Sequence, residues 1–93
     1  MGFRIFKVRG NSMQPTLQHN DYVLCWRWLG TRFKVGDVIV THHPAFHTII
    51  KRIIQTDTEK GYLLAGDNPN STPTHQLGWI KKEEVIGKVI KHI

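Results

Sequence analysis

Apolar and polar residues alternate in short runs along this chain, and turn-forming residues separate the runs. The alternation predicts strands at residues 3–8, 22–28, 38–41 and 62–65. Glycine, asparagine and aspartate are concentrated at the junctions between these runs, where tight turns need them. A helical period is almost absent, so the pattern favours an all-β fold.

Two further apolar runs have individual features. Residues 48–55 carry adjacent branched residues on each side of Lys51-Arg52, which is typical of a strand buried on both faces. Residues 85–93 are interrupted at Gly87, which predicts a bulged strand that closes the sheet. Together the runs predict a single domain over residues 1–93, built as a small, partly barrelled antiparallel sheet of about six short strands.

The first strand ends at Gly10, and a short turn or one-turn helix is expected at residues 12–17, where Pro15 suits an early helical position. Ser12 therefore lies at a junction between a strand and a turn. A serine in such a place is commonly a cap or turn residue. It becomes a nucleophile only when a neighbouring base takes its proton.

Lys51 is the candidate base. Strand alternation puts it on the same face as Ile49 and Ile53, and it puts Arg52 on the opposite face. Apolar surroundings disfavour the charged amine and lower its pKa, which would leave a neutral amine able to accept a proton. The alternative is an ordinary edge-strand lysine that discourages aggregation.

Composition adds limits on the class of protein. The chain has 93 residues, of which 40% are hydrophobic and 22% charged, as expected for one soluble globular domain. Its net charge of +6 favours an anionic partner, but no more than two basic residues are adjacent, so a solvated surface is favoured over nucleic-acid binding. The single cysteine, Cys25, excludes an internal disulfide and fits a reducing compartment.

No run of residues has the roughly 20 apolar positions that a membrane span needs. The first ten residues also lack the apolar centre of a secretion signal. We therefore expect a cytoplasmic protein without a membrane anchor.

Several motifs occur along the chain in an informative order. They are Ser12-Met13-Gln14-Pro15-Thr16-Leu17, Asp21-Tyr22-Val23-Leu24, Val35-Gly36-Asp37-Val38-Ile39-Val40, Ile50-Lys51-Arg52-Ile53, Gly66-Asp67-Asn68 with Ser71, Gly78-Trp79-Ile80, and Ile86-Gly87-Lys88-Val89. In this order they resemble the signal peptidase I family of serine/lysine proteases. The resemblance covers residues 10–89, which is nearly the whole chain.

The resemblance implies a role for four side chains. Ser12 corresponds to the acylating nucleophile, and Lys51 to the general base that later protonates the leaving amine. The backbone N–H of Ser12 would be one oxyanion donor. Met13 would line the substrate pocket, unless it is simply a core methionine, and Ser71 would orient the lysine. No cofactor is implied.

The chain departs from the family pattern at several positions. Gly10 replaces a serine that completes the oxyanion hole in some members, and Asn20 replaces a glycine, which is allowed because asparagine tolerates positive φ. Residues 66–71 are one residue shorter than usual, and the signature at residues 66–68 is expected to shape the turn beside the dyad. Residues 73–75 read Pro-Thr-His instead of Asp-Ser-Arg, which removes an expected ion-pair network.

We also expect the chain to be without the membrane anchor and extra β domain that these peptidases usually have. It resembles the small soluble branch proposed to mature nickel-type superoxide dismutase, through its motifs at residues 34–40 and 66–69. The resemblance implies a serine endopeptidase whose partner is a protein substrate, the dismutase precursor, from which it removes an N-terminal leader.

Two alternatives remain open. The first is a self-cleaving repressor-type peptidase domain, which shares the Ser-Met-x-Pro and lysine motifs. It needs a cleavage site upstream, and the nine residues before Gly10 contain no Ala-Gly or Cys-Gly pair. The second is a basic β domain without catalysis that binds single-stranded nucleic acid, with Trp26 and Trp28 as a stacking platform.

Trp26 and Trp28 share one strand face, and we interpret them as core residues or as the apolar wall of a peptide cleft. His42, His43 and His47 raise the question of a metal site. Adjacent histidines on a strand point to opposite faces, so we interpret these three as solvated polar residues and assign no metal.

Overall fold

Seven strands form one antiparallel sheet in the computed structural model, which describes residues 2–93. Met1, part of the predicted domain, lies outside the described residues. The strand order is β1-β2-β7-β3-β4-β5-β6, so β1 and β6 are the edges and the sheet is not closed. The strands are β1 (Gly2–Lys7), β2 (Tyr22–Arg27), β3 (Val38–His43), β4 (His47–Asp57), β5 (Gly61–Ala65), β6 (Trp79–Ile80) and β7 (Val85–His92).

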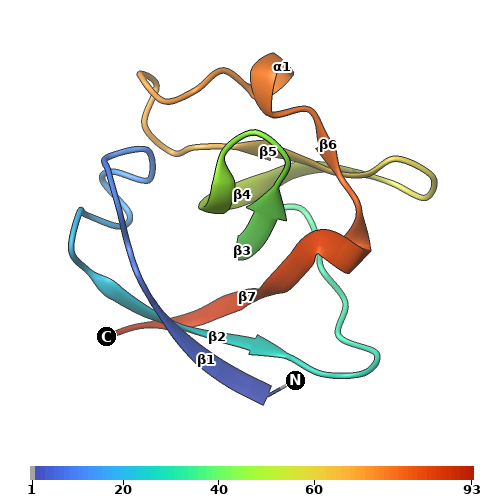
Figure 1. Ribbon diagram of the computed structural model, residues 1–93, viewed down its shortest axis with the longest axis horizontal. Helices are drawn as coiled ribbons and strands as arrows, with labels where there is room; N and C mark the ends of the chain where they lie inside the picture. Colours follow the sequence, from blue (N-terminus) through green and yellow to red (C-terminus); the bar gives the residue numbers. More distant parts are fainter. Residues whose placement is uncertain (1) are drawn as a thin grey trace.

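The sheet bends into two parts. Figure 1 shows β1, β2 and β7 together at the bottom of the view, with β4, β5, β6 and the helix α1 (Thr74–Leu77) above them. A single turn of 3₁₀ helix, η1 (Lys82–Glu84), leads into β7. The loop between β1 and β2 approaches the segment that precedes α1, and these two segments carry most of the predicted site.

The all-β prediction is confirmed, and all six predicted strands are present with ends within two residues of those expected. The seventh strand, β6, was missed because two residues are too few to display alternation. Residues 12–17 form turns without a helix, so the turn was the correct alternative.

The bulges of β7 are confirmed, but the expectation that this strand closes the sheet is wrong, because β7 lies between β2 and β3 inside an open sheet. Ile86 is an extra residue in the pairing of β7 with β3, and Ile90 is an extra residue in its pairing with β2. Gly87 lies close to β2, since a Cβ atom there would be 3.1 Å from the Cys25 sulfur. Bulges increase local twist and bend a strand, which allows β7 to join both parts of the sheet.

Two hydrophobic clusters fill the interior, and β4 contributes to both. Ile49 packs against the first and Ile50 against the second. The first cluster contains Phe33, Ile39, Ile53, Tyr62, Leu64, Leu77, Ile80 and Val85, and the second contains Val8, Met13, Leu17 and Val23.

Burial on both faces was predicted for residues 48–55, and this is wrong at Thr48, Ile54 and Gln55, which are exposed. The pairing of β4 with β5 shifts register between Ile53 and Gln55. Ile54 therefore falls in a bulge and is 43% exposed. The buried part of β4 is the part next to Lys51.

Candidate active site

A cleft of about 200 Å³ lies between the end of β1, the loop that follows it and the first half of β4. It contains three of the four predicted site residues, Ser12, Met13 and Lys51. Its other lining residues are Phe6, Lys7, Val8, Arg9, Phe46, Thr48, Ile49, Ile50, Thr72 and Leu77. The cleft is thus mainly apolar, and one serine and one buried lysine line it.

The loop carrying Ser12 is held firmly at its base. Hydrogen bonds from the Val8 N–H to the Asp21 carbonyl (2.7 Å) and from the Asn20 N–H to the Val8 carbonyl (2.9 Å) close it. Asn20 has φ of 75°, so the expectation that it replaces glycine at a positive-φ position is confirmed. The loop therefore starts and ends at a fixed point beside β1.

Asn68 anchors the backbone on both sides of the Ser12 amide. Its own N–H donates to the Ser12 carbonyl at 2.9 Å, and its side-chain Nδ2 donates to the Asn11 carbonyl at 3.0 Å. The Asn68 Oδ1 accepts from the Asn70 N–H, which fixes the orientation of the amide. The Gly66-Asp67-Asn68 signature thus shapes the turn beside Ser12, as expected.

Gly66 permits the close approach of these two loops. A Cβ atom at this position would lie 2.5 Å from the Ser12 carbonyl oxygen and 2.4 Å from the Ser71 Oγ. Ala65, the last residue of β5, is paired with Arg52 on β4. Gly66 comes directly after Ala65, so it lies beside the part of β4 that contains Lys51. The absence of a side chain at Gly66 therefore lets the serine loop lie beside the lysine strand.

Lys51 is 5% exposed, in agreement with the interpretation of a buried lysine. Its partner on the neighbouring strand β3 is Ile39, and Ile53, two residues along β4, is fully buried. Burial lowers the pKa of the Lys51 amine below its ordinary value. Within residues 2–93, its Nζ makes no hydrogen bond or ion pair. An amine in this environment favours the neutral form more than a surface lysine does.

Arg52, the neighbour of Lys51, points to the other face and holds the Asp67 carboxylate through two hydrogen bonds of 2.8 and 2.7 Å. The hydrogen bond from Arg52 lowers the pKa of Asp67, and a bond from the Thr16 hydroxyl at 2.6 Å acts in the same direction. Although residues 73–75 lack the expected charges, this ion pair joins β4, the 66–71 segment and the serine loop.

The oxyanion donors can be traced along the serine loop. The Gly10 N–H donates to Nδ1 of His19 at 2.9 Å, so this amide is already engaged. In the described part of the chain, no group accepts a hydrogen bond from the Ser12 N–H. The Ser12 amide is therefore free to stabilise an anion in the cleft, and the role of His19 was not evident from its sequence spacing.

Ser71 does not line the cleft, although Thr72 does. Its hydroxyl lies against Gly66, and its N–H donates to the Asn68 carbonyl at 3.0 Å. A role in orienting Lys51 stays a prediction. Met13 lines the cleft and is also fully buried in the second hydrophobic cluster, so the interpretation as a core methionine applies. A role in lining a substrate pocket stays a prediction.

Two interpretations of aromatic residues were wrong. The Trp26 and Trp28 rings stack with centroids 6.0 Å apart, but neither ring lines the cleft, and Trp28 is 54% exposed instead of forming core. His43 was interpreted as solvated, yet it is buried. His42, on the opposite face of β3, is exposed as expected. Among residues 2–93, no three potential ligands are grouped as a metal site would require.

Comparison with known proteins identifies the family. Residues 3–90 match the model of a family described as Peptidase S24-like. The chain belongs to the Peptidase S24-like family. This membership covers both predicted catalytic residues and the cleft between them.

The relatives of this S24-like chain include signal peptidase subunits. It is 31% identical over 98 residues to the signal peptidase complex catalytic subunit SEC11 of Metarhizium robertsii, covering 92% of this chain and 55% of the relative. The same subunit of Metarhizium acridum is 26% identical, with 95% and 56% covered. The chain thus spans about half the length of these relatives.

No helix within residues 2–93 has the length and apolar character required to cross a lipid bilayer.

Replacing Gly66 by alanine should disrupt the site through steric overlap. The new Cβ would displace the Ser12 carbonyl, and we expect a loss of about 1–3 kcal/mol in the free energy of unfolding, measured by denaturant titration. The double variant Gly66→Ala/Ser71→Gly removes the overlap with the Ser71 side chain, but it should not recover the lost stability, because the overlap with the Ser12 carbonyl oxygen remains. Wild-type stability of Gly66→Ala would contradict the close approach.

Replacing Lys51 by methionine should stabilise the fold at neutral pH. Because the pKa of Lys51 is lower in the folded chain, the unfolded chain binds more protons between the two pKa values. Wild-type stability therefore rises with pH across that interval, and the advantage of Lys51→Met should be largest below it and fade above it. Thermal unfolding of both proteins from pH 6 to 11 measures this, with the exposed Lys91→Met as control. A constant difference across pH would indicate a solvated amine.

Proposed function

We propose that this chain is a serine endopeptidase in which Ser12 is the nucleophile and Lys51 the general base. The observation that carries the proposal is that a serine and a buried lysine without a counter-ion line the same apolar cleft. Membership of a peptidase family and similarity to signal peptidase subunits support the same reaction class.

In the proposed reaction, the neutral Lys51 amine accepts the hydroxyl proton as the Ser12 Oγ forms a bond to the peptide carbonyl carbon. The Ser12 N–H stabilises the resulting oxyanion. The Lys51 ammonium then donates its proton to the leaving amine as the C–N bond breaks, which leaves an ester on Ser12. Water attacks this ester with Lys51 again as base, and the free serine is restored.

The substrate is proposed to bind as an added strand. β1 is an edge strand, and β4 pairs with β5 only from Arg52 onward, so the part of β4 between His47 and Lys51 also has an unpaired edge. Both edges border the cleft. An extended peptide can form backbone hydrogen bonds to such edges while its side chains enter the apolar cleft.

We further propose that the substrate carries an N-terminal leader and that the first candidate is the nickel-type superoxide dismutase precursor in the cytoplasm. The relatives are catalytic subunits of signal peptidase complexes, which supports leader removal as the class of reaction. The dismutase precursor is supported by the sequence resemblance at residues 34–40 and 66–69.

The test is to incubate the purified chain with the dismutase precursor and, separately, with a secretory preprotein, and to weigh the products by mass spectrometry. Ser12→Ala and Lys51→Met should each slow cleavage at least about 1,000-fold, while Lys91→Met should not. Below the lowered pKa of Lys51, the wild-type rate should fall with decreasing pH, because the base must be neutral.

The rival functions give different results in the same assays. Cleavage within the chain itself, without added substrate, would indicate a repressor-type peptidase. Salt-dependent binding of single-stranded oligonucleotides, with no acylation of Ser12 by a serine-reactive probe, would favour the nucleic-acid module. Undiminished cleavage by Ser12→Ala would remove the serine from the mechanism.

A further inference from the structure

His43, the last residue of β3, has a buried ring whose two nitrogens are both engaged. The residue is 7% exposed. Its Nε2 lies 2.7 Å from the Leu77 carbonyl oxygen. Its Nδ1 accepts hydrogen bonds from the Ala45 N–H at 3.0 Å and the Phe46 N–H at 3.2 Å. The ring therefore connects the β3–β4 turn to the end of α1.

These contacts determine the tautomer. A carbonyl oxygen can only accept, so Nε2 must carry the proton and donate it to Leu77. Two amide N–H groups point at Nδ1, so this nitrogen must be unprotonated. The neutral Nε2–H form thus satisfies all three backbone groups, which a hydrocarbon side chain would leave unpaired inside the protein.

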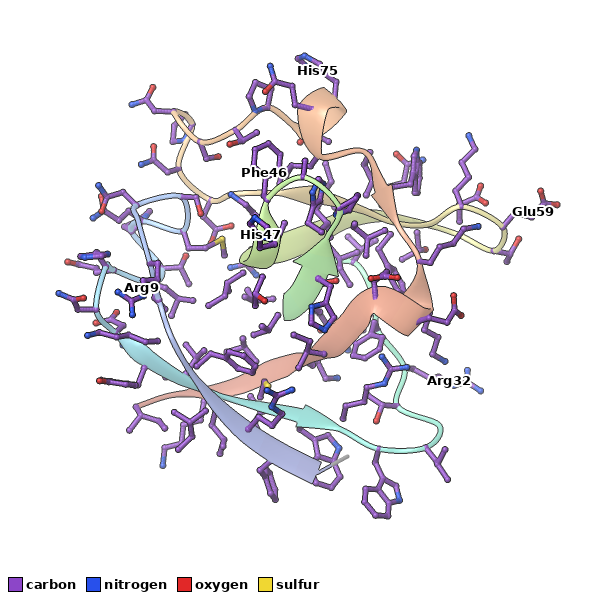
Figure 2. All side chains as sticks on the ribbon, in the orientation of Figure 1. Arg9, Arg32, Phe46, His47, Glu59 and His75 are labelled. Atoms are coloured by element: carbon purple, nitrogen blue, oxygen red, sulfur yellow. The ribbon has the colours of Figure 1, made fainter. Side chains whose placement is uncertain are left out.

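The two segments that His43 joins also form part of the cleft. Phe46, in the β3–β4 turn, and Leu77, at the end of α1, both line it. The His43 and Phe46 rings pack with centroids 4.9 Å apart, and Phe46 remains 41% exposed at the rim. Figure 2 shows Phe46 on the turn next to α1, with His75 on the outer side of that helix. His43 itself is not among the residues that line the cleft.

We propose that His43 is a positioning residue that holds Phe46 and Leu77 as one rigid wall of the cleft, and that Phe46 selects an apolar side chain of the substrate. This inference rests on the proposed peptidase function. His43 acts through the wall and does not touch the reacting atoms. Its loss should therefore weaken binding of substrate more than it slows the chemical steps at Ser12 and Lys51.

Steady-state kinetics with a protein that the wild-type chain cleaves test whether His43 affects substrate binding and not the chemical steps. His43→Leu should raise KM about fivefold or more with kcat within about twofold of wild type, and Phe46→Ala should do the same. The double variant should be no worse than the single ones, because both remove the same wall. His43→Gln, which can donate to Leu77 and accept from the turn, should recover much of the loss. His42→Leu, on the exposed face next to it, is the matched control.

Nuclear magnetic resonance tests the wall without any substrate. In the wild-type chain, the His43 ring should show the Nε2–H tautomer at neutral pH, and the Ala45 and Phe46 amides should exchange slowly with solvent. These two amides should lose protection in His43→Leu and keep it in His43→Gln. If His43→Leu does not fold, the wild-type tautomer and exchange, together with the kinetics of Phe46→Ala, decide the question.

The outcomes distinguish the two levels of the proposal. The positioning role of His43 would be overturned by an unchanged KM in a folded His43→Leu variant, or by an Nδ1–H tautomer with fast-exchanging Ala45 and Phe46 amides. Cleavage that still depends on Ser12 would leave the proposed peptidase function in place. Cleavage that does not depend on Ser12 would overturn the proposed function, and the tautomer and amide exchange would then decide alone whether His43 holds the wall.

Discussion

Burial of the Lys51 amine without a carboxylate partner is the constraint on which the candidate site depends. A buried ammonium is costly, and the usual remedy in proteins is an ion pair. Here the neighbouring cation, Arg52, takes the available carboxylate of Asp67, and Lys51 is left among isoleucines. Its pKa is lowered by burial alone, which is the condition under which a lysine can accept a proton at moderate pH.

The serine is held by a different set of forces. Backbone hydrogen bonds close its loop at β1, and Asn68 holds the carbonyls of Asn11 and Ser12. Gly66 allows this contact because it has no side chain. The Arg52–Asp67 pair then ties the same segment to β4. One short segment after β5 therefore contacts both the loop of Ser12 and the strand of Lys51.

Sequence alternation was sufficient to predict six strands and the all-β class, because each depends on residues close in the chain, but it left open whether Lys51 is buried or is an ordinary edge-strand lysine. The positive φ of Asn20 was expected from the resemblance, because Asn20 stands where the family has a glycine. Resemblance supplied the pairing of Ser12 with Lys51 as candidates, and the structure brings both to one cleft. Ile54 could not be predicted as exposed, because a register shift against β5 determines its environment.

His43 and the tryptophans were misjudged because their surroundings come from distant parts of the chain. The partner that buries His43 is Leu77, and nothing in the local pattern around His42-His43-Pro44 indicates it. Trp26 and Trp28 have the spacing of core residues, but Trp26 is only half-buried against Phe3 of β1, and Trp28 lies beyond the end of β2 and is 54% exposed.

The two bulges of β7 have a geometric consequence for enzyme design. β7 pairs with β2 on one side and β3 on the other, so it connects the half of the sheet that carries the serine to the half that carries the lysine. The separation between hydroxyl and amine is then a function of how strongly one strand curves. Insertions or deletions near Ile86 and Ile90 would change the position of Ser12 relative to Lys51 while every residue that lines the cleft stays the same.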